Sequence, residues 1–195
     1  MFRNSSLFSA VAIELLLATP LLADEPKSKA DTPEAVARKA MEAMKENRLD
    51  DFAKTMHPEA LKSVKSALVA VAEAAAKDGR ENEVLVLFGD KSLDDLKKLS
   101  DAQFFVAFYG GLTRLRPELK RTISGAEVQI IGHVLEGKDT AHVVLRMTAT
   151  VEGTKVTKTD VVSMRKTETG WGMLLSADLE NMASVLKRRF GVEKK

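Results

Sequence analysis

The stretch from Ala126 to Ser176 constrains the fold most, because apolar and polar residues alternate along it between glycine-containing turns. Every odd position from 141 to 151 is apolar. Most even positions carry polar side chains, namely His142, Arg146, Thr148 and Thr150. This alternation is typical of a half-buried antiparallel strand, and Gly137, Gly153 and Gly170 suit tight hairpin loops. We therefore predict a meander of four antiparallel strands, with the odd row facing the core and the even row facing outward.

The residues before this stretch have the periodicity of helices. We predict a first helix that begins at Pro33, followed by a short helix that Asp50 caps. A longer helix is expected from Pro58 to Lys77, with its apolar face against the sheet. The segment from Glu83 to Phe88 fits either a buried strand or a helical turn, and we favour the helix.

Further helices are predicted in the middle and at the end of the chain. Two capping boxes begin at Ser92 and Ser100, and Pro117 ends the helix that follows the second of them. After the meander, Ser176 or Asp178 caps a final helix. Helices first and strands afterwards give an α+β fold, in which a helical N-terminal half packs on a curved four-stranded sheet and a helix closes the chain.

The first residues have the composition of an export signal. Arg3 precedes an apolar run from Leu7 to Leu22, and Ala23 is a small residue before an acidic pair. We predict a signal peptide at 1–23, a flexible lead-in at 24–31, one domain at 32–191 and a tail at 192–195. The alternative is an uncleaved membrane anchor, but the run is short for a bilayer span and Glu14 interrupts it.

The composition narrows the cellular location and the partners. With the export signal, we expect a periplasmic or secreted protein. The chain has no cysteine, which excludes a lipoprotein anchor and leaves the core alone to hold the fold without disulfides. Its formal net charge is only +2, which argues against nucleic acid as a partner. After cleavage of the signal we expect no membrane association.

Both ends of the predicted domain resemble nuclear transport factor 2-like domains. The similarity lies in the segment from Glu34 to Pro58, with its Asn47–Phe52 junction, and in the closing hairpins from Thr140 to Val144 and from Gly170 to Met173. The resemblance implies a curved sheet wrapped around helices as a cone. Such domains include small-molecule binders, isomerases, dehydratases and non-enzymatic interaction modules, often dimeric through the sheet.

Asp160 is the first candidate site residue. It shares the strand parity of Val162 and Met164, so it is expected on the apolar face, where desolvation would raise the pKa of its carboxyl group toward that of a general base. Isomerases of the family that the chain resembles use an acidic base in this way. The alternative is an ion pair at the strand surface, because Lys158 has the same parity.

Other candidates are aromatic residues and one histidine. Tyr109 is a candidate hydrogen-bond donor within an aromatic helix face, and His142 is a second donor if the two sheet faces are reversed. The candidate ligand-binding residues are Asp160, Tyr109, Trp171, Met164 and Phe108. The histidines are too scattered for a metal site, and no motif indicates a cofactor.

These observations favour an exported, non-enzymatic binding or interaction module that holds a small apolar ligand or a protein partner and forms a homodimer through the sheet. The alternative is a ketosteroid-isomerase-like or dehydratase-like enzyme with Asp160 as the general base and Tyr109 or His142 as the donor. A third hypothesis is a purely structural assembly protein, which would need a large apolar outer face on the sheet. The polar side chains at even positions of the strand argue against such a face.

Overall fold

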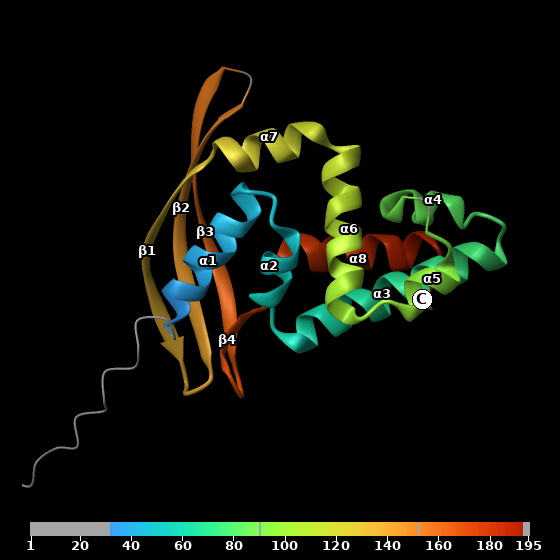
Figure 1. The fold of residues 1–195 in the computed structure, drawn as a ribbon, viewed down its shortest axis with the longest axis horizontal. Coiled ribbons are helices and arrows are strands. Elements are labelled where there is room, and N and C mark those ends of the chain that lie inside the picture. The colour runs from blue at the N-terminus through green and yellow to red at the C-terminus, as the bar shows by residue number, and fades with distance from the viewer. Residues whose placement is uncertain (1–31, 90, 152, 193–195) are drawn as a thin grey trace, which may run out of the picture.

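The computed structural model describes residues 32–89, 91–151 and 153–192. Its elements are α1 (Pro33–Lys45), α2 (Leu49–Lys54), α3 (Pro58–Lys77), α4 (Asn82–Leu85), η2 (Val86–Phe88), α5 (Leu93–Lys98), α6 (Asp101–Leu115), α7 (Pro117–Gly125), β1 (Glu127–Glu136), β2 (Thr140–Val151), β3 (Thr154–Thr167), β4 (Gly170–Met173) and α8 (Ala177–Arg189). The predicted α+β fold is confirmed. Figure 1 shows the sheet at one side of the molecule, with α1 across it and α3 to α5 reaching away. The predicted signal peptide and lead-in lie outside the described residues, as do residues 193–195 of the tail.

The sheet is the predicted antiparallel meander. Its strands follow one another in the order β1-β2-β3-β4, and the sheet is open. The parity expected for β2 is confirmed near its start, where Ala141, Val143 and Leu145 are almost fully buried. A bulge shifts the register of β1 between Ile130 and Gly132, and such bulges increase the local twist of a strand.

Helix α1 is the element that covers the sheet. The Thr32 side chain caps it by accepting a hydrogen bond from the backbone N–H of Ala35, and Pro33 occupies its first turn. Its buried face consists of small residues, including Ala37, Ala40 and Ala43, each of them 0% exposed. Small side chains let the helix approach closely, and α1 contacts β1, β2 and β4.

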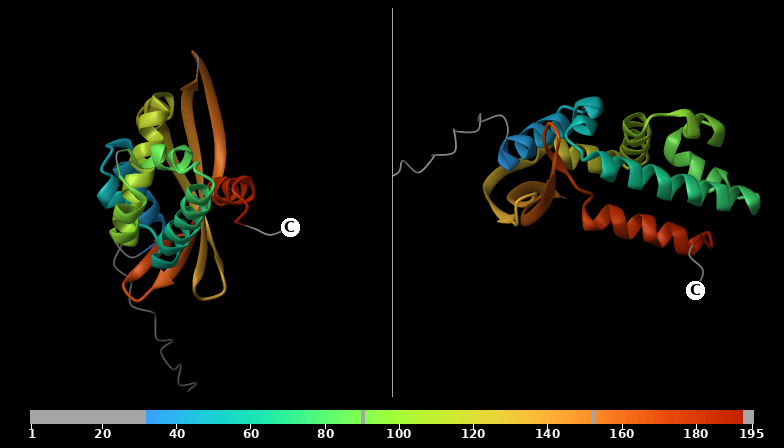
Figure 2. Two further views of the ribbon diagram at one scale, coloured as in Figure 1. Left: turned by 90° about the vertical axis from the view of Figure 1, so that its right-hand side faces the viewer. Right: turned by 90° about the horizontal axis from the view of Figure 1, so that it is seen from below.

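The long helix α3 spans the predicted residues, but its expected packing against the sheet is wrong. Its apolar face instead packs mainly against α6 and α8. The face of the sheet is taken by α1, and α7 contacts β2. As Figure 2 shows, α3 and α8 run side by side away from the sheet. The core of this helical part is aromatic: the rings of Phe88 and Phe104 lie 4.9 Å apart between centroids.

One further local prediction is wrong, and one helix was not predicted. Asp50 does not cap α2, because Asn47 adopts a positive φ of 56° and the helix already begins at Leu49. Pro117 ends α6 as expected but also opens α7, which the sequence analysis missed. Proline fits the first turn of a helix because the N–H that it lacks has no partner there.

Other predictions for the helices are confirmed. The segment from Glu83 to Phe88 is helical, with α4 running into η2. Both capping boxes are formed, by Ser92 and by Ser100. Ser176 rather than Asp178 caps α8. None of the described helices combines the length and the apolar composition that crossing a bilayer requires.

The connection between α2 and α3 pairs with β4 and so joins the helical part to the sheet. The backbone N–H of His57 donates to the carbonyl of Met173 at 2.8 Å, and the N–H of Met173 donates to the carbonyl of Thr55 at 2.9 Å. Met56 and Met173 form a parallel bridge at this point. Gly172 lies directly against the His57 backbone, which leaves no space for a side chain.

Candidate functional site

A cavity of about 480 Å³ lies between the helix-facing side of the sheet and the helices around it. Its walls are mostly apolar and come from helices, strands and the linker before α8. Helices contribute Met41, Met44, Phe52, Phe105, Tyr109, Leu112 and Leu119, and the sheet contributes Leu145, Met147, Asp160 and Val162. The linker between β4 and α8 closes the remaining side with Leu174, Leu175 and Ser176. A largely apolar cavity with a few polar groups is the usual form of a small-molecule site.

Tyr109 places a phenolic hydroxyl group in the wall of this cavity. The residue is only 9% exposed, and its ring packs edge-on against Phe52, at 5.4 Å between ring centroids. Phe105, one turn earlier on α6, stacks on it at 6.0 Å. Within the described part of the chain no group forms a hydrogen bond with the Tyr109 hydroxyl. No side-chain nitrogen or oxygen among the described residues is both fully buried and without a partner, so the Tyr109 hydroxyl is accessible from the cavity and can bind a ligand.

Burial raises the pKa of Tyr109 to about 12, because desolvation disfavours the phenolate. Tyr109 is the only tyrosine of the chain, so an ultraviolet titration at phenolate wavelengths reports on this residue alone. We expect ionisation near pH 12 in the folded protein and near pH 10 in urea, about the ordinary value.

The same shift makes stability depend on pH. The contribution of Tyr109 to the free energy of unfolding is complete below the unfolded pKa of about 10 and is lost as the pH rises toward the folded value. A folded-state ionisation near pH 10 would contradict the burial of this hydroxyl.

Asp160 lies in the wall of the same cavity, as its parity predicted. Of the two alternatives for its carboxyl group, the ion pair is confirmed and the raised pKa is not. Its carboxylate accepts a hydrogen bond from the Lys158 ammonium at 2.9 Å and another from the backbone N–H of Val161. The bond from Lys158 is the largest influence and holds the pKa of Asp160 below its ordinary value. Partial exposure leaves desolvation too weak to reverse this. Asp160 is therefore an ion-paired carboxylate and not a raised-pKa base.

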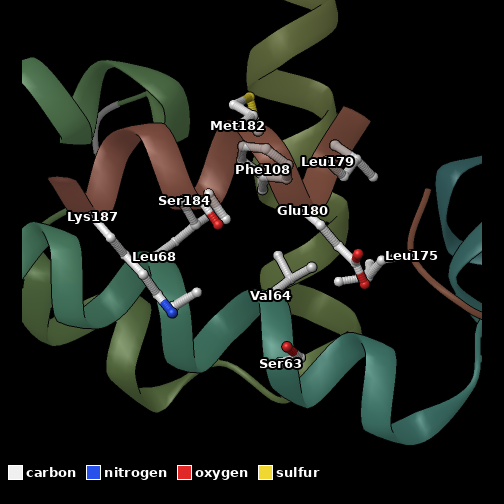
Figure 3. A pocket seen from close by; sticks show the side chains of 12 residues that line it. Ser63, Val64, Leu68, Phe108, Leu175, Leu179, Glu180, Met182, Ser184 and Lys187 are labelled. Atoms are coloured by element: carbon white, nitrogen blue, oxygen red, sulfur yellow. The ribbon is translucent and has the colours of Figure 1, made fainter. Parts of the chain in front are cut away.

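The remaining candidates do not join this cavity. Phe108 lines a separate groove between α3 and α8, shown in Figure 3. Met164 is fully buried in the core. Trp171 packs against the core, and the ammonium of Lys166 lies 5.6 Å from the centroid of its ring. His142 projects from the even row of β2 and contacts Glu136 at 2.8 Å and Ser163 at 3.0 Å.

Sequence reasoning missed the methionines of the cavity wall. Met41 and Met44 project from α1, Met147 from β2, and Met56 and Met173 meet at the bridge between the two parts of the fold. Methionine side chains are flexible and polarizable, so they adapt to ligands of different shape. The spacing of Met41 and Met44 marks one helix face, but only the tertiary structure brings all five together.

Comparison with known proteins finds no family model, no curated protein and no solved structure that matches this chain. The resemblance to nuclear transport factor 2-like domains therefore stays a hypothesis. Among the described residues, no group of three or more histidine, aspartate and glutamate side chains is arranged to hold a metal ion.

Proposed function

We propose that the protein binds a small, mainly apolar ligand whose oxygen atom accepts a hydrogen bond from Tyr109. The observation that carries this proposal is the hydroxyl of Tyr109, which has no hydrogen-bond partner among the described residues and lies in the apolar wall of a cavity of about 480 Å³. The hydroxyl is accessible from the cavity, so it can still take a hydrogen-bond partner. A ligand with a carbonyl, ether or hydroxyl oxygen supplies that partner.

The alternative is an isomerase-like or dehydratase-like enzyme with Asp160 as its base. One observation favours it, since Asp160 and Tyr109 line the same cavity. The lowered pKa of Asp160 opposes it, because a general base works best with a pKa near the operating pH. Binding without catalysis is therefore the better-supported function.

The proposal extends to location and assembly. Export rests on Arg3 and the apolar run before Ala23. A homodimer through the outer face of the sheet is supported by two exposed valines, Val134 at 63% and Val161 at 53%. Exposed apolar residues on a sheet face are a common feature of interfaces.

The Tyr109→Phe variant tests the role of the hydroxyl with two ligands of equal shape. 1-Indanone carries a carbonyl oxygen and indane does not, and each is titrated against bound N-phenyl-1-naphthylamine, a fluorescent probe of apolar sites. We expect the variant to bind indanone about three- to tenfold more weakly and to bind indane as the native protein does, because one hydrogen bond is lost.

The native protein sets the reference for this experiment. Equal loss for both ligands would mean that the substitution disturbs the cavity rather than a hydrogen bond. Unchanged binding of indanone would remove Tyr109 from the site. If neither ligand displaces the fluorescent compound from the native protein, the proposed function is wrong for molecules of this class.

A further inference from the structure

The cavity under the sheet does not end at the linker between β4 and α8. A second groove, of about 290 Å³, lies between α3 and α8, and Leu175 and Leu179 line both spaces. Figure 3 shows the groove with Val64 of α3 on one side and Leu179 and Met182 of α8 on the other. The two spaces are therefore neighbours, with these two leucines in the walls of both.

The lining of the groove is apolar on its inner side and polar at its rim, where Ser63, Glu180, Ser184 and Lys187 contribute. Its walls include Val64, Leu68, Phe108 and Met182, which are apolar. Phe108 lies between the cavity residues Phe105 and Tyr109 of α6, so one helix supplies aromatic rings to both spaces. Six of the seven methionines in the described residues line one space or the other, and the seventh, Met164, is buried in the core. Such walls adapt to a flexible chain better than to one rigid shape.

The charges at the cavity favour an uncharged head group. Two carboxylates, Asp160 and Asp178, line the cavity. The Lys158 ammonium donates a hydrogen bond to Asp160. A carboxylate ligand placed here would meet two carboxylates and one ammonium that is already paired. An alcohol, ester or amide oxygen avoids this repulsion and still accepts a hydrogen bond from Tyr109.

We infer that the ligand is a molecule with a single flexible hydrocarbon chain and an uncharged oxygen group, held with its oxygen at Tyr109 and its chain passing Leu175 and Leu179 into the groove between α3 and α8. This inference rests on the proposed function, because it assigns a ligand class to the same cavity. A rigid bicyclic ligand occupies the first space alone. A long chain occupies both.

Methionine methyl groups report the position of such a chain directly. The protein is labelled with ¹³C at the methionine methyl carbon, and each signal is assigned by a single Met→Leu substitution. 1-Octanol and 1-dodecanol are then titrated separately. We expect octanol to shift the signals of cavity residues such as Met44 and Met147, and dodecanol to shift these and also the signal of Met182. Met164 should not move with either alcohol.

The outcomes separate this inference from the proposed function. If dodecanol shifts the cavity methionines but never Met182, the long-chain inference is wrong and the proposed function stands. If octanol shifts Met182 as readily as dodecanol does, the groove is a separate site and the inference is also wrong. If neither alcohol shifts any cavity methionine, both are wrong. A shift of Met164 with the others would indicate general loosening and would also overturn the inference.

A variant at the junction adds an affinity test. Leu179→Trp is expected to close the passage, and Val185→Trp places the same side chain at an exposed position of α8, where Val185 is 52% exposed. In the native protein and in Val185→Trp, dodecanol should bind more tightly than octanol by up to about threefold to fourfold for each added methylene. In Leu179→Trp the gain per methylene should disappear, whatever the change in octanol affinity, because the indole ring closes the passage. A gain that persists would contradict the passage.

Discussion

Replacing Gly111 with alanine is expected to destabilise the protein by at least about 3 kcal/mol. Backbone atoms, unlike the end of a flexible side chain, cannot move aside to relieve the overlap. A β-carbon at this position would lie 1.5 Å from the carbonyl oxygen of Leu87 and 2.5 Å from its carbonyl carbon. The contact is between α6 and η2, so the helix must move away from the segment on which it packs. Urea unfolding followed by circular dichroism and by the fluorescence of Trp171, the only tryptophan, measures the loss.

The neighbouring glycine is a matched control. A β-carbon on Gly110 would meet only a methyl carbon of Leu49 at 3.5 Å, an ordinary contact. Gly110→Ala should therefore keep the fold and gain about 0.5–1 kcal/mol from the better helix propensity of alanine. Similar stabilities for the two variants would show that α6 does not cross η2 as closely as described.

Replacing Gly172 with alanine is expected to cost about 2–3 kcal/mol through a different contact. The added β-carbon would lie 2.7 Å from the α-carbon and 2.9 Å from the nitrogen of His57. Since the N–H of His57 donates to Met173, the substitution forces apart the backbone pair that joins the helical part to the sheet. The free energy of unfolding from urea titration is again the measurement.

Gly125 is the control for this site. It ends α7 in open space, where an added β-carbon meets no atom within 4 Å. Gly125→Ala should therefore leave the free energy of unfolding within about 0.5 kcal/mol of the native value, as is usual for surface substitutions. If Gly172→Ala behaves in the same way, the pairing of Met173 with the α2–α3 connection is wrong.

The sheet was predictable because the patterns that indicate strands and hairpins involve residues close together in the sequence. A two-residue alternation assigns each side chain to a face, and glycine between apolar runs marks the hairpins. The same reasoning correctly placed Asp160 on the helix-facing side with Val162, and it identified Ser92 and Ser100 as helix starts. Each of these predictions depends on residues only a few positions apart.

The errors concern contacts between distant residues. The apolar stripe of α3 shows that one face is buried but does not show against what, and α1 takes the place on the sheet. The pKa of Asp160 depended on a choice between burial and pairing with Lys158, and parity alone did not decide it. A proline is compatible both with the end of one helix and with the start of the next, and Pro117 occupies both positions here.

The candidate site was only partly visible in the sequence for the same reason. Tyr109 and Asp160 were identified one by one, and they line one cavity because α6 and β3 face each other across it. No short-range pattern in the sequence links Tyr109 or Asp160 with Leu175 or with Met56. The cavity arises where α1, α6, the sheet and the linker before α8 meet, so its volume and its free hydroxyl group follow from tertiary structure.

Occupation of the cavity is the central claim, and a pair of phenylalanine substitutions tests it most directly. Val162 lies in the cavity wall, whereas Val134 is 63% exposed on β1 and lines none of the cavities described above. N-Phenyl-1-naphthylamine is titrated into the native protein, Val162→Phe and Val134→Phe while fluorescence is recorded. We predict saturable binding at one site, weakened by about tenfold or more in Val162→Phe, since the added ring takes the ligand's space, and changed by less than about twofold in Val134→Phe. Equal affinity in all three proteins, or no saturable binding to the native protein, would contradict a ligand site in this cavity.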